Sequence, residues 1–257
     1  FLRDIQKRER PDLLGVAFDP KGGSFRREIF PEYKANRAET PEDILLSVPY
    51  VKRVLEAMCI PILEVEGYEA DDVIGTLSQK AAAEGYEVFM VTPDKDYGQL
   101  VRPCCKLYKQ KGDGIEIVDC DAIRAHYGFD DPTLVRDVLA LWGDASDNIP
   151  GVPGIGEKIA CKLVREWGTV ENILDNVSKI KGKQGEKIAE WGDKLRLAKT
   201  LTTICLDVPI PFREEDLTVC EPHIDELKAL FAELDFKAFM NDLTNLAPPE
   251  EQPEGPR

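Results

Sequence analysis

Five of the carboxylates between residues 66 and 96 fall into two groups. Glu69, Asp71 and Asp72 open a segment with helical apolar spacing, whereas Asp94 and Asp96 follow a short β-prone run. A helix start and the carboxyl end of a neighbouring strand can meet at the ligand-binding edge of an open α/β sheet. Acids brought together there repel each other, and Mg²⁺ relieves this repulsion because it takes oxygen ligands and commonly partners phosphate. The spacing therefore predicts a carboxylate-built Mg²⁺ site for phosphodiester chemistry.

Two elements must position these acids. Apolar residues at helical spacing predict a helix that begins at Glu69, and the run 88–91 predicts a buried parallel strand. Acids in a first turn also suit the positive end of a helix dipole, so a plain charged helix start stays open as an alternative. Asp19 ends another predicted buried strand, over residues 13–19. Alone it is a turn residue; alongside Asp94 it is interpreted as a further ligand.

Residues 22–41 alternate basic and aromatic side chains with little apolar periodicity, which predicts a loop or an irregular helical excursion. Basic side chains bind phosphate oxygens and a tyrosine can stack on a base; a solvated, charged loop is the alternative. Thr40 and Pro41, followed by acids, predict a helix that ends near Met58, with Thr40 as its N-cap. Residues 60–65 predict a short strand.

The stretch 143–158 joins Asp144 and Asp147 to a dense Gly/Pro turn that an amphipathic helix follows. The two acids could be surface charges, but a Gly-x-Gly turn that opens a helix exposes backbone N–H groups to an anion. The turn lacks the Gly-Lys-Ser/Thr of a Walker loop. It fits a helix–hairpin–helix, in which turn amides and nearby lysines hold a DNA backbone. Several short helices with exposed lysines are expected over residues 160–200.

The remaining segments complete a mixed α/β pattern. Residues 107–118 predict a β-hairpin, and residues 121–127 and 133–142 predict helices. An amphipathic helix pair is expected over residues 223–243. The Pro- and Glu-rich residues 247–257 predict a disordered linker to a following domain.

Composition bounds the class of protein. The chain has 257 residues, of which 43% are hydrophobic and 32% charged, as in ordinary globular proteins. No apolar run reaches transmembrane length and no signal segment opens the chain, so we expect a cytoplasmic protein without a membrane partner. The seven cysteines lack the paired spacing of a zinc site, and they predict free thiols in a reducing compartment. The two histidines lie far apart, which disfavours a histidine-based metal site.

The net charge of −15 argues at first against nucleic acid, whose phosphates dominate affinity. Its distribution changes that view. Residues 201–257 hold 4 Lys/Arg against 13 Asp/Glu, whereas residues 151–200 hold 10 against 7. The clustered carboxylates lie in the remaining residues 1–150. An acidic tail and a metal-binding cluster thus explain the total without forbidding a basic, DNA-facing strip.

These motifs are similar to those of a known family, the 5′ nuclease (flap endonuclease) domains at the N-terminus of bacterial DNA polymerase I. The resemblance covers residues 1 to about 246. It is carried by Phe18-Asp19 with Ser24-Phe25-Arg26, Tyr33-Lys34-x-x-Arg37, Gly67-Tyr68-Glu69-Ala70-Asp71-Asp72-Val73, Thr92-Pro93-Asp94-Lys95-Asp96, Gly143-Asp144-x-Ser146-Asp147-Asn148-x-Pro150-Gly151 and Gly154-Ile155-Gly156-Glu157-Lys158.

The resemblance implies an α/β fold of the PIN-like, 5′ nuclease type. A mostly parallel central sheet flanked by helices would span residues 1–142, and an all-helical helix–hairpin–helix region would span residues 143–246, before the linker 247–257. The implied activity is structure-specific 5′-3′ exonuclease and flap endonuclease cleavage of DNA by two-metal-ion catalysis, in replication (Okazaki primer removal) and repair. The implied cofactors are two or more Mg²⁺ ions, for which Mn²⁺ can substitute, and K⁺ at the helix–hairpin–helix turn.

The resemblance also implies roles for individual residues. The implied metal ligands are Asp19, Glu69, Asp71, Asp72, Asp94 and Asp96 at or near a first site, with Asp144 and Asp147 at a second. Lys34 and Arg37 are the implied catalytic residues, which steer the scissile phosphate. The implied DNA contacts are Arg26, Tyr33, Lys34, Arg37, Gly151, Gly154, Gly156, Lys158 and Lys162.

The implied partners are DNA with 5′ flaps, nicks or 5′ ends, RNA primers on DNA, and a covalently linked polymerase domain, in a nucleoid-associated monomer. One departure matters: the family begins with a strand that carries Asp-Gly, whose Asp is a metal ligand, and this chain starts after it. We therefore expect a fragment that lacks its first central strand. Two alternatives stay open, a non-catalytic module that binds duplex DNA and a related metal-dependent ribonuclease.

Overall fold

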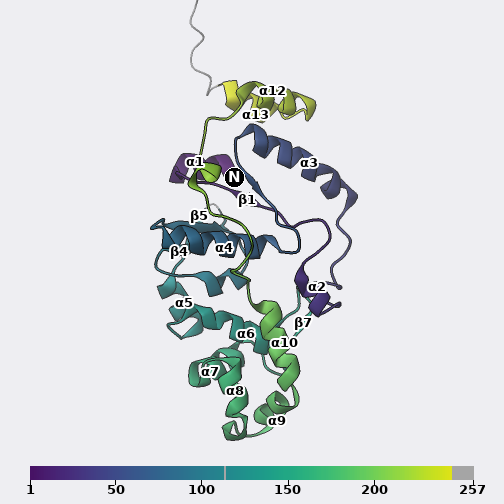
Figure 1. Ribbon diagram of the computed structural model, residues 1–257, viewed down its shortest axis with the longest axis vertical. Helices are drawn as coiled ribbons and strands as arrows, with labels where there is room; N and C mark the ends of the chain where they lie inside the picture. The colour runs from purple at the N-terminus through teal and green to yellow at the C-terminus, as the bar shows by residue number, and fades with distance from the viewer. Residues whose placement is uncertain (113, 245–257) are drawn as a thin grey trace, which may run out of the picture. The chain divides into compact units, whose positions relative to one another are not determined.

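The computed structural model describes residues 1–112 and 114–244 and shows an α/β protein (Figure 1). The predicted linker 247–257 lies outside the described residues. The chain forms two compact units. Among the described residues, the first unit combines residues 1–16, 39–63 and 213–244, and the second unit combines residues 17–38 and 64–212.

The first unit is mainly helical. Its elements are α1 (Leu2–Glu9), β1 (Val16–Ala17, at the division between units), α3 (Glu42–Ala57), β2 (Ile62–Leu63), α11 (Glu214–Leu217), α12 (Ile224–Glu233) and α13 (Lys237–Thr244). Its core forms where Ala57 of α3 meets Leu227, Leu230 and Phe231 of α12. The helices predicted over 41–58 and 223–243 are confirmed in kind, but the predicted N-cap is wrong. Pro41, not Thr40, caps α3, because the chain becomes helical at Glu42.

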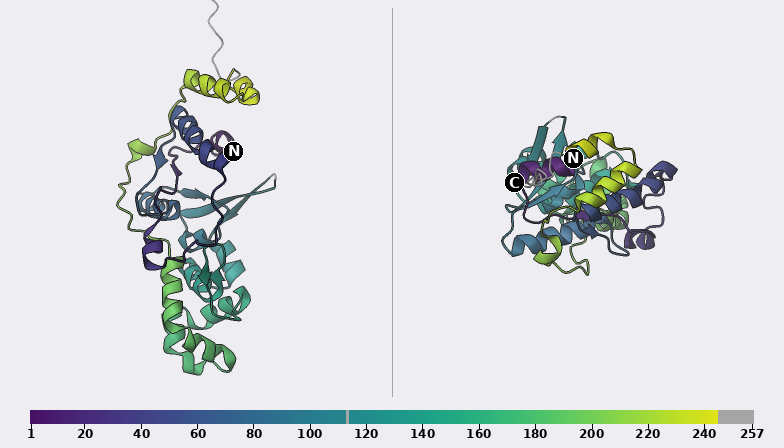
Figure 2. Two further views of the ribbon diagram at one scale, coloured as in Figure 1. Left: turned by 90° about the vertical axis from the view of Figure 1, so that its right-hand side faces the viewer. Right: turned by 90° about the horizontal axis from the view of Figure 1, so that it is seen from above.

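The sheet of the second unit follows the predicted pattern. Its strands are β3 (Val88–Val91), β4 (Cys105–Lys111) and β5 (Gly114–Val118), in the order β3-β4-β5. β3 pairs parallel with β4, and β4 pairs antiparallel with β5 as the expected hairpin, which Figure 2 shows as a two-stranded ribbon. The described strands do not join into one large sheet: β1 and β2, and β6 (Gly143–Asp144) and β7 (Ile149–Pro150), form two further two-stranded sheets.

Helices make up most of the second unit. They are α2 (Phe25–Ile29), α4 (Ala70–Ala83), α5 (Cys120–Tyr127), α6 (Val135–Trp142), α7 (Glu157–Trp167), α8 (Val170–Asp175), α9 (Lys183–Glu190) and α10 (Gly192–Thr202), with 3₁₀ turns η1 (Asp96–Leu100), η2 (Pro132–Leu134) and η3 (Val177–Lys179). The α/β class with a helical region toward the C-terminal end is thereby confirmed. None of the described helices is long and apolar enough to span a membrane.

Helix α6 is the centre of this helical region. Its residues from Val138 to Leu141 are fully buried, and α7, α8 and α10 pack around it (Figure 1). A buried ion pair ties three of these helices together. Asp137 on α6 accepts a hydrogen bond from the backbone N–H of Val170 at 2.8 Å and lies 2.8 Å from the ammonium of Lys199 on α10. The Asp137 carboxylate therefore holds α6, α8 and α10 together.

The β6–β7 hairpin leads from α6 into that turn, and two glycines let its backbones pass unusually close. Gly143 has a φ of +85°, and a Cβ placed on it would lie 2.3 Å from the Gly151 nitrogen. A Cβ placed on Gly151 would lie 2.1 Å from the Trp142 carbonyl oxygen. Neither contact can be relieved by a side-chain rotation, because the clashing atoms are backbone atoms. Glycine is therefore a steric requirement at both positions.

Replacing Gly151 by alanine is expected to lower the free energy of unfolding by about 1–3 kcal/mol, the usual cost of overpacking. Urea denaturation would measure this loss. Gly192→Ala is the matched control. Gly192 is the first residue of α10, where an added Cβ would meet only Leu174 at 4.0 Å, so this change should be neutral or stabilising. Equal stability of Gly151→Ala and the parent protein would contradict the close approach.

Candidate active site

The N-terminus of α4 is the framework of the site. Glu69 is its N-cap, and its backbone N–H donates to the Asp72 carboxylate at 3.1 Å. This local hydrogen bond holds the first turn in place. It also gives a partner to one of the N–H groups at the helix start that the helix itself leaves unpaired. Asp71 lies between the two and is directed elsewhere. One helical turn therefore brings Glu69 and Asp72 to the same side and directs Asp71 to Tyr97.

Arg26 neutralises the buried member of this trio. Its guanidinium donates to both Asp72 oxygens at 2.7 Å and to Glu69 at 3.2 Å, and it also donates to the Leu201 and Thr203 carbonyls. Arg26 is 2% exposed and Asp72 is 0% exposed. Burial opposes the charge of Arg26, but its hydrogen bonds and ion pair with Asp72 raise its pKa above the ordinary value. The pair is thus a charged, fully bonded part of the core.

This burial gives Arg26 and Asp72 a positioning role. The Asp72 oxygens accept hydrogen bonds from Arg26, from Glu69 and from the backbone N–H of Cys205 at 2.8 Å. The guanidinium of Arg26 has no exposed surface to offer DNA. The structure therefore does not support the predicted DNA contact of Arg26, and it shows Asp72 as the anchor of α4 with both oxygens occupied.

A second network surrounds Asp147. The hydroxyl of Tyr33 lies 2.9 Å from both Glu69 and Asp147, and the ammonium of Lys34 lies 2.6 Å from Glu69 and 3.9 Å from Asp147. Arg37 contacts the other Asp147 oxygen at 2.6 Å. Tyr33 is only 2% exposed, so its ring has no surface on which a base could stack. The structure therefore joins the predicted residues Tyr33, Lys34, Arg37, Glu69 and Asp147 in one network.

In the described chain, a third group of carboxylates accepts hydrogen bonds only from uncharged donors. Asp19 accepts from the backbone N–H of Ala70 at 2.8 Å, and Asp94 accepts from that of Asp96 at 2.9 Å. Asp71 accepts from the hydroxyl of Tyr97 at 2.7 Å. Within residues 1–112 and 114–244, neither Asp19, Asp71 nor Asp94 forms an ion pair with a lysine or arginine. These three acids therefore lack a direct cationic partner, and Lys34 stabilises the charge of Asp71 only from a distance.

Burial and nearby negative charge raise the pKa values of Asp71 and Asp96. Burial, together with the negative charges of Asp94 and Glu69, raises the pKa of Asp71 to about 6 against the lowering effects of Tyr97 and Lys34. Burial, Asp94 and Asp144 raise the pKa of Asp96 to about 7. Crowded carboxylates disfavour one another's charged forms. A bound cation would remove this penalty.

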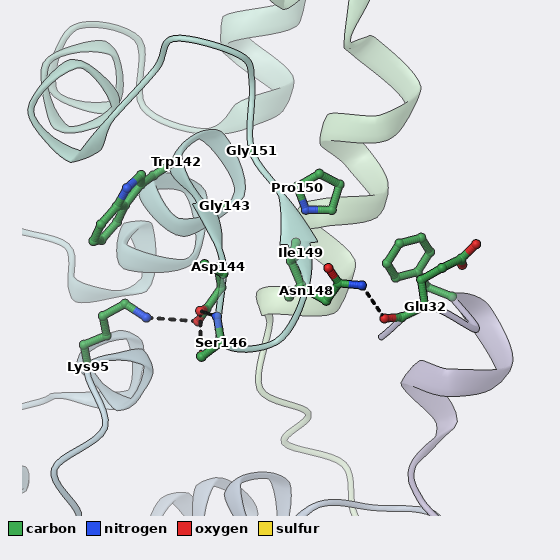
Figure 3. A pocket seen from close by; sticks show the side chains of 12 residues that line it. Glu32, Lys95, Trp142, Gly143, Asp144, Ser146, Asn148, Ile149, Pro150 and Gly151 are labelled. Atoms are coloured by element: carbon green, nitrogen blue, oxygen red, sulfur yellow. Dashed lines mark hydrogen bonds and ion pairs between the residues drawn. The ribbon is translucent and has the colours of Figure 1, made fainter. Parts of the chain in front are cut away.

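Lys95 links Asp96 to Asp144 beside an open cavity of about 710 Å³. Its ammonium lies 3.1 Å from Asp96 and 2.9 Å from Asp144, as Figure 3 shows for the second contact. Ser146 donates its N–H and hydroxyl to the other Asp144 oxygen at 2.9 and 2.7 Å. Burial works against the charge of Asp144, but the hydrogen bonds from Ser146 and Lys95 lower its pKa below the ordinary value.

Lys95 and Tyr97 are the site residues that sequence reasoning missed. Lys95 stands between two acids of the Thr92–Asp96 motif, and Tyr97 directly follows it. For Lys95, the available signal was its position between two aspartates. Tyr97 carried no such signal, because only the tertiary fold brings its hydroxyl to Asp71, 26 positions earlier.

The donor set fits a divalent cation, although the described residues contain no group of three or more acids, cysteines or histidines already arranged to hold one. Each of the other predicted metal ligands is paired with an internal cation, namely Arg26, Lys34, Arg37 or Lys95. The ligands available are carboxylate oxygens, which suit hard cations such as Mg²⁺. Chemistry and charge therefore both favour a metal at Asp19, Asp71 and Asp94.

The predicted helix–hairpin–helix turn forms a separate surface of the second unit. Gly154 is exposed with a φ of +83°, and Gly156 is the N-cap of α7. Lys158 and Lys162 lie exposed on α7, one turn apart, and the ammonium of Lys187 donates to the Pro153 carbonyl at 2.9 Å. Gly151 is less exposed and belongs to the tight β6–β7 crossing. The turn and the start of α7 thus expose backbone groups and lysine side chains to solvent.

The fold and the site together define an α/β protein with a carboxylate cluster and, on a separate surface, a helix–hairpin–helix turn. Residues 1–128 match the family described as 5′-3′ exonuclease, N-terminal resolvase-like domain. Residues 131–225 match the family described as 5′-3′ exonuclease, C-terminal SAM fold. The chain belongs to the 5′-3′ exonuclease family. The domain limits predicted at residues 142 and 246 stay predictions.

Individual proteins agree with this family. The chain is 35% identical to the 5′-3′ exonuclease of Aquifex aeolicus, over 96% of this chain and 84% of that protein. It is 40% identical to DNA polymerase I of Bacillus caldotenax, over 98% of this chain. It spans only 29% of the length of that polymerase.

Solved structures share the fold. The T5 D15 protein co-crystallised with metal ions has a TM-score of 0.70 and 22% sequence identity, covering 96% of this chain and 90% of that chain. A substituted form of the bacteriophage T5 D15 flap endonuclease, in a pseudo-enzyme–product complex with DNA and metal ions, has a TM-score of 0.63 at 22% identity, over 95% of this chain and 87% of that chain. At this identity the likeness establishes the fold alone.

Proposed function

We propose that this chain hydrolyses DNA phosphodiester bonds near 5′ ends, as a structure-specific 5′-3′ exonuclease and flap endonuclease. The observation that carries the proposal is the cluster of Asp19, Asp71 and Asp94, which accept hydrogen bonds from uncharged donors and form no direct ion pair in the described chain, in a chain of the 5′-3′ exonuclease family. The proteins that match it are a 5′-3′ exonuclease and DNA polymerases I. One alternative, a non-catalytic DNA-binding module, gives no reason for acids to crowd at a cost in charge repulsion.

The proposed cofactors are two or more Mg²⁺ ions, with Mn²⁺ as a substitute. Asp19, Asp71, Asp94 and Asp96 would hold the first site, supported by Glu69 and by the buried anchor Asp72. Asp144 and Asp147 would serve the second site. When bound, two such ions supply an activated water and stabilise the leaving oxygen of the cleaved bond. No side-chain nucleophile is required.

Lys34 and Arg37 are proposed to hold the scissile phosphate. The Nζ atom of Lys34 is held in place by Glu69, 2.6 Å away. Arg37 has five N–H donors, and its contacts with the Ser146 carbonyl and Asp147 use the Nε and Nη2 groups. Its side chain is 52% exposed, so its remaining donors can reach phosphate oxygens while Asp147 keeps it oriented. These cations would offset negative charge that builds on the phosphate in the transition state.

The turn from Gly151 to Lys158 is proposed to hold the DNA backbone. Its exposed glycines and the lysines Lys158 and Lys162 can contact phosphates without reading bases. The proposal includes a K⁺ ion at the turn. The proposed substrates are DNA with 5′ flaps, nicks or 5′ ends, including RNA primers on DNA. We further propose that the enzyme acts as a monomer within a chain that also carries a polymerase domain, because the matching polymerases are DNA polymerases I.

Cleavage of a 5′-labelled flap duplex tests the function. The purified protein is incubated with the duplex and Mg²⁺ or Mn²⁺, then with an excess of EDTA, and compared with a single-stranded RNA of equal length. We expect metal-dependent release of the flap, no release after EDTA, and slower cleavage of the RNA. Duplex binding without cleavage under all metal conditions would favour the non-catalytic module, and preferential RNA cleavage would favour the ribonuclease.

A further inference from the structure

Two cysteines of the first unit face each other across 161 positions of sequence. Cys59 follows α3, and Cys220 lies in the segment that leads to α12. The thiol of Cys59 donates to the carbonyl of Glu221, the residue next to Cys220, at 3.2 Å. The thiol of Cys220 in turn donates to the Cys59 carbonyl at 3.8 Å. Each sulfur therefore reaches the backbone of the other cysteine's segment.

The backbone around this pair is fixed by its own contacts. The N–H of His223 donates to the Ala57 carbonyl at 2.7 Å, and the N–H of Cys59 donates to the Glu56 carbonyl at 2.9 Å. Ala57 also packs in the core that α3 forms with α12 (Figure 1). Because the bond from His223 to Ala57 ties the two segments together beside the cysteines, the two thiols are held near enough to share a hydrogen bond without a covalent bond between them.

The two thiols differ in their access to solvent. Cys220 is exposed, whereas Cys59 is half-buried. Burial and a hydrogen bond with the Cys220 thiol raise the pKa of Cys59. The other five cysteines offer no second pair of this kind among the described residues: Cys105, for example, is buried and donates to the Ser78 carbonyl. An oxidant in solution would therefore meet Cys220 first, with Cys59 as the nearest thiol behind it.

We propose that Cys59 and Cys220 form a reversible oxidation site that closes to a disulfide with a two-electron oxidant such as hydrogen peroxide. The Cys220 thiolate attacks a peroxide oxygen, which gives a sulfenic acid and, after proton uptake, one water. The Cys59 thiolate then attacks the Cys220 sulfur, forms the S–S bond and expels the sulfenic oxygen as a second water. In sum two thiols and one peroxide give one disulfide and two waters.

The disulfide would tie the end of α3 to the segment before α12. A cross-link between positions so far apart restricts the unfolded chain strongly, so oxidation should stabilise the first unit. The proposed nuclease residues all lie in the second unit, and this inference does not depend on the proposed function. A dithiol such as dithiothreitol should reopen the bond.

Peptide mapping of the intact chain tests the proposal without any variant. The protein is fully reduced, exposed to hydrogen peroxide, blocked with an alkylating agent and digested without reductant. We expect a linked peptide that contains Cys59 and Cys220, its loss on treatment with dithiothreitol, and a reversible rise in the melting temperature. Both cysteines recovered as separate alkylated or over-oxidised peptides would overturn the proposal.

Serine variants separate the two roles. In Cys59→Ser, the sulfenic acid at Cys220 has no resolving thiol, so labelling of Cys220 by dimedone should increase. In Cys220→Ser, no linked peptide should form and the melting temperature should no longer respond to peroxide. Cys104→Ser, which removes another exposed thiol, is the matched control and should behave like the parent. A linked peptide through Cys104 in place of Cys220 would contradict the assignment.

Discussion

Replacing Asp94 by asparagine is expected to abolish cleavage of the flap duplex and to spare duplex binding. Asparagine keeps a carbonyl oxygen, so it can still accept the hydrogen bond from the Asp96 N–H that Asp94 accepts at 2.9 Å. It removes a full negative charge from the proposed metal ligands. Outer-shell substitutions at metal sites cost roughly 10- to 100-fold, so loss of a direct ligand should reduce the rate by at least about 100-fold.

The same substitution should leave the protein as stable as before or more stable. Asp94 repels both Asp71 and Asp96 and contributes to the raised pKa of each. Removing its charge relieves that repulsion in the metal-free protein. A variant that melts at a higher temperature but is less active would show that the repulsion between these charges is kept because function requires it. A merely structural role of Asp94 would produce the opposite change in stability.

Single-turnover cleavage of the labelled flap and a duplex-binding titration would measure the two effects of Asp94→Asn. Asp175→Asn is the control, because Asp175 is exposed at the end of α8 and far in sequence from the site. Full activity in Asp94→Asn would remove Asp94 from the proposed metal ligands. Lost duplex binding would instead indicate that the acid acts by orienting DNA.

Replacing Arg26 by methionine is expected to lower the free energy of unfolding by about 3–5 kcal/mol, the usual cost of leaving a buried charge without its partner. Methionine fills much of the space of the arginine stem, so the cost comes mainly from Asp72, which is 0% exposed. Two hydrogen bonds of 2.7 Å would be lost, and with them the neutralising charge. The first turn of α4 would lose its anchor.

Urea denaturation of Arg26→Met and of Arg27→Met would test this prediction. Arg27 is the exposed neighbour on α2, and its replacement should stay within about 0.5 kcal/mol of the parent. Adding Asp72→Asn to Arg26→Met should recover part of the loss, because the unpaired buried charge is then gone. Additive effects of the two substitutions would show that the ion pair is not energetically coupled.

The sequence by itself determined the local elements and the chemical type of the site. Apolar spacing and turn residues identified α4, β3, the β4–β5 hairpin and the helix pair α12–α13, because these features depend on neighbours a few residues away. The grouping of acids in the same segments identified a carboxylate cluster for the same reason. Family motifs added the nuclease class, which the matches of residues 1–128 and 131–225 then established.

Only the tertiary structure decided which acids are free and which are neutralised. Arg26 meets Asp72 across 46 positions, Lys95 meets Asp144 across 49, and Tyr33 meets Asp147 across 114. A motif records residue types but not these distant partners, so Arg26 and Tyr33 were expected at the DNA and lie instead in the core. Charge balance in a folded protein depends on contacts between segments, and such contacts exist only once the chain has folded.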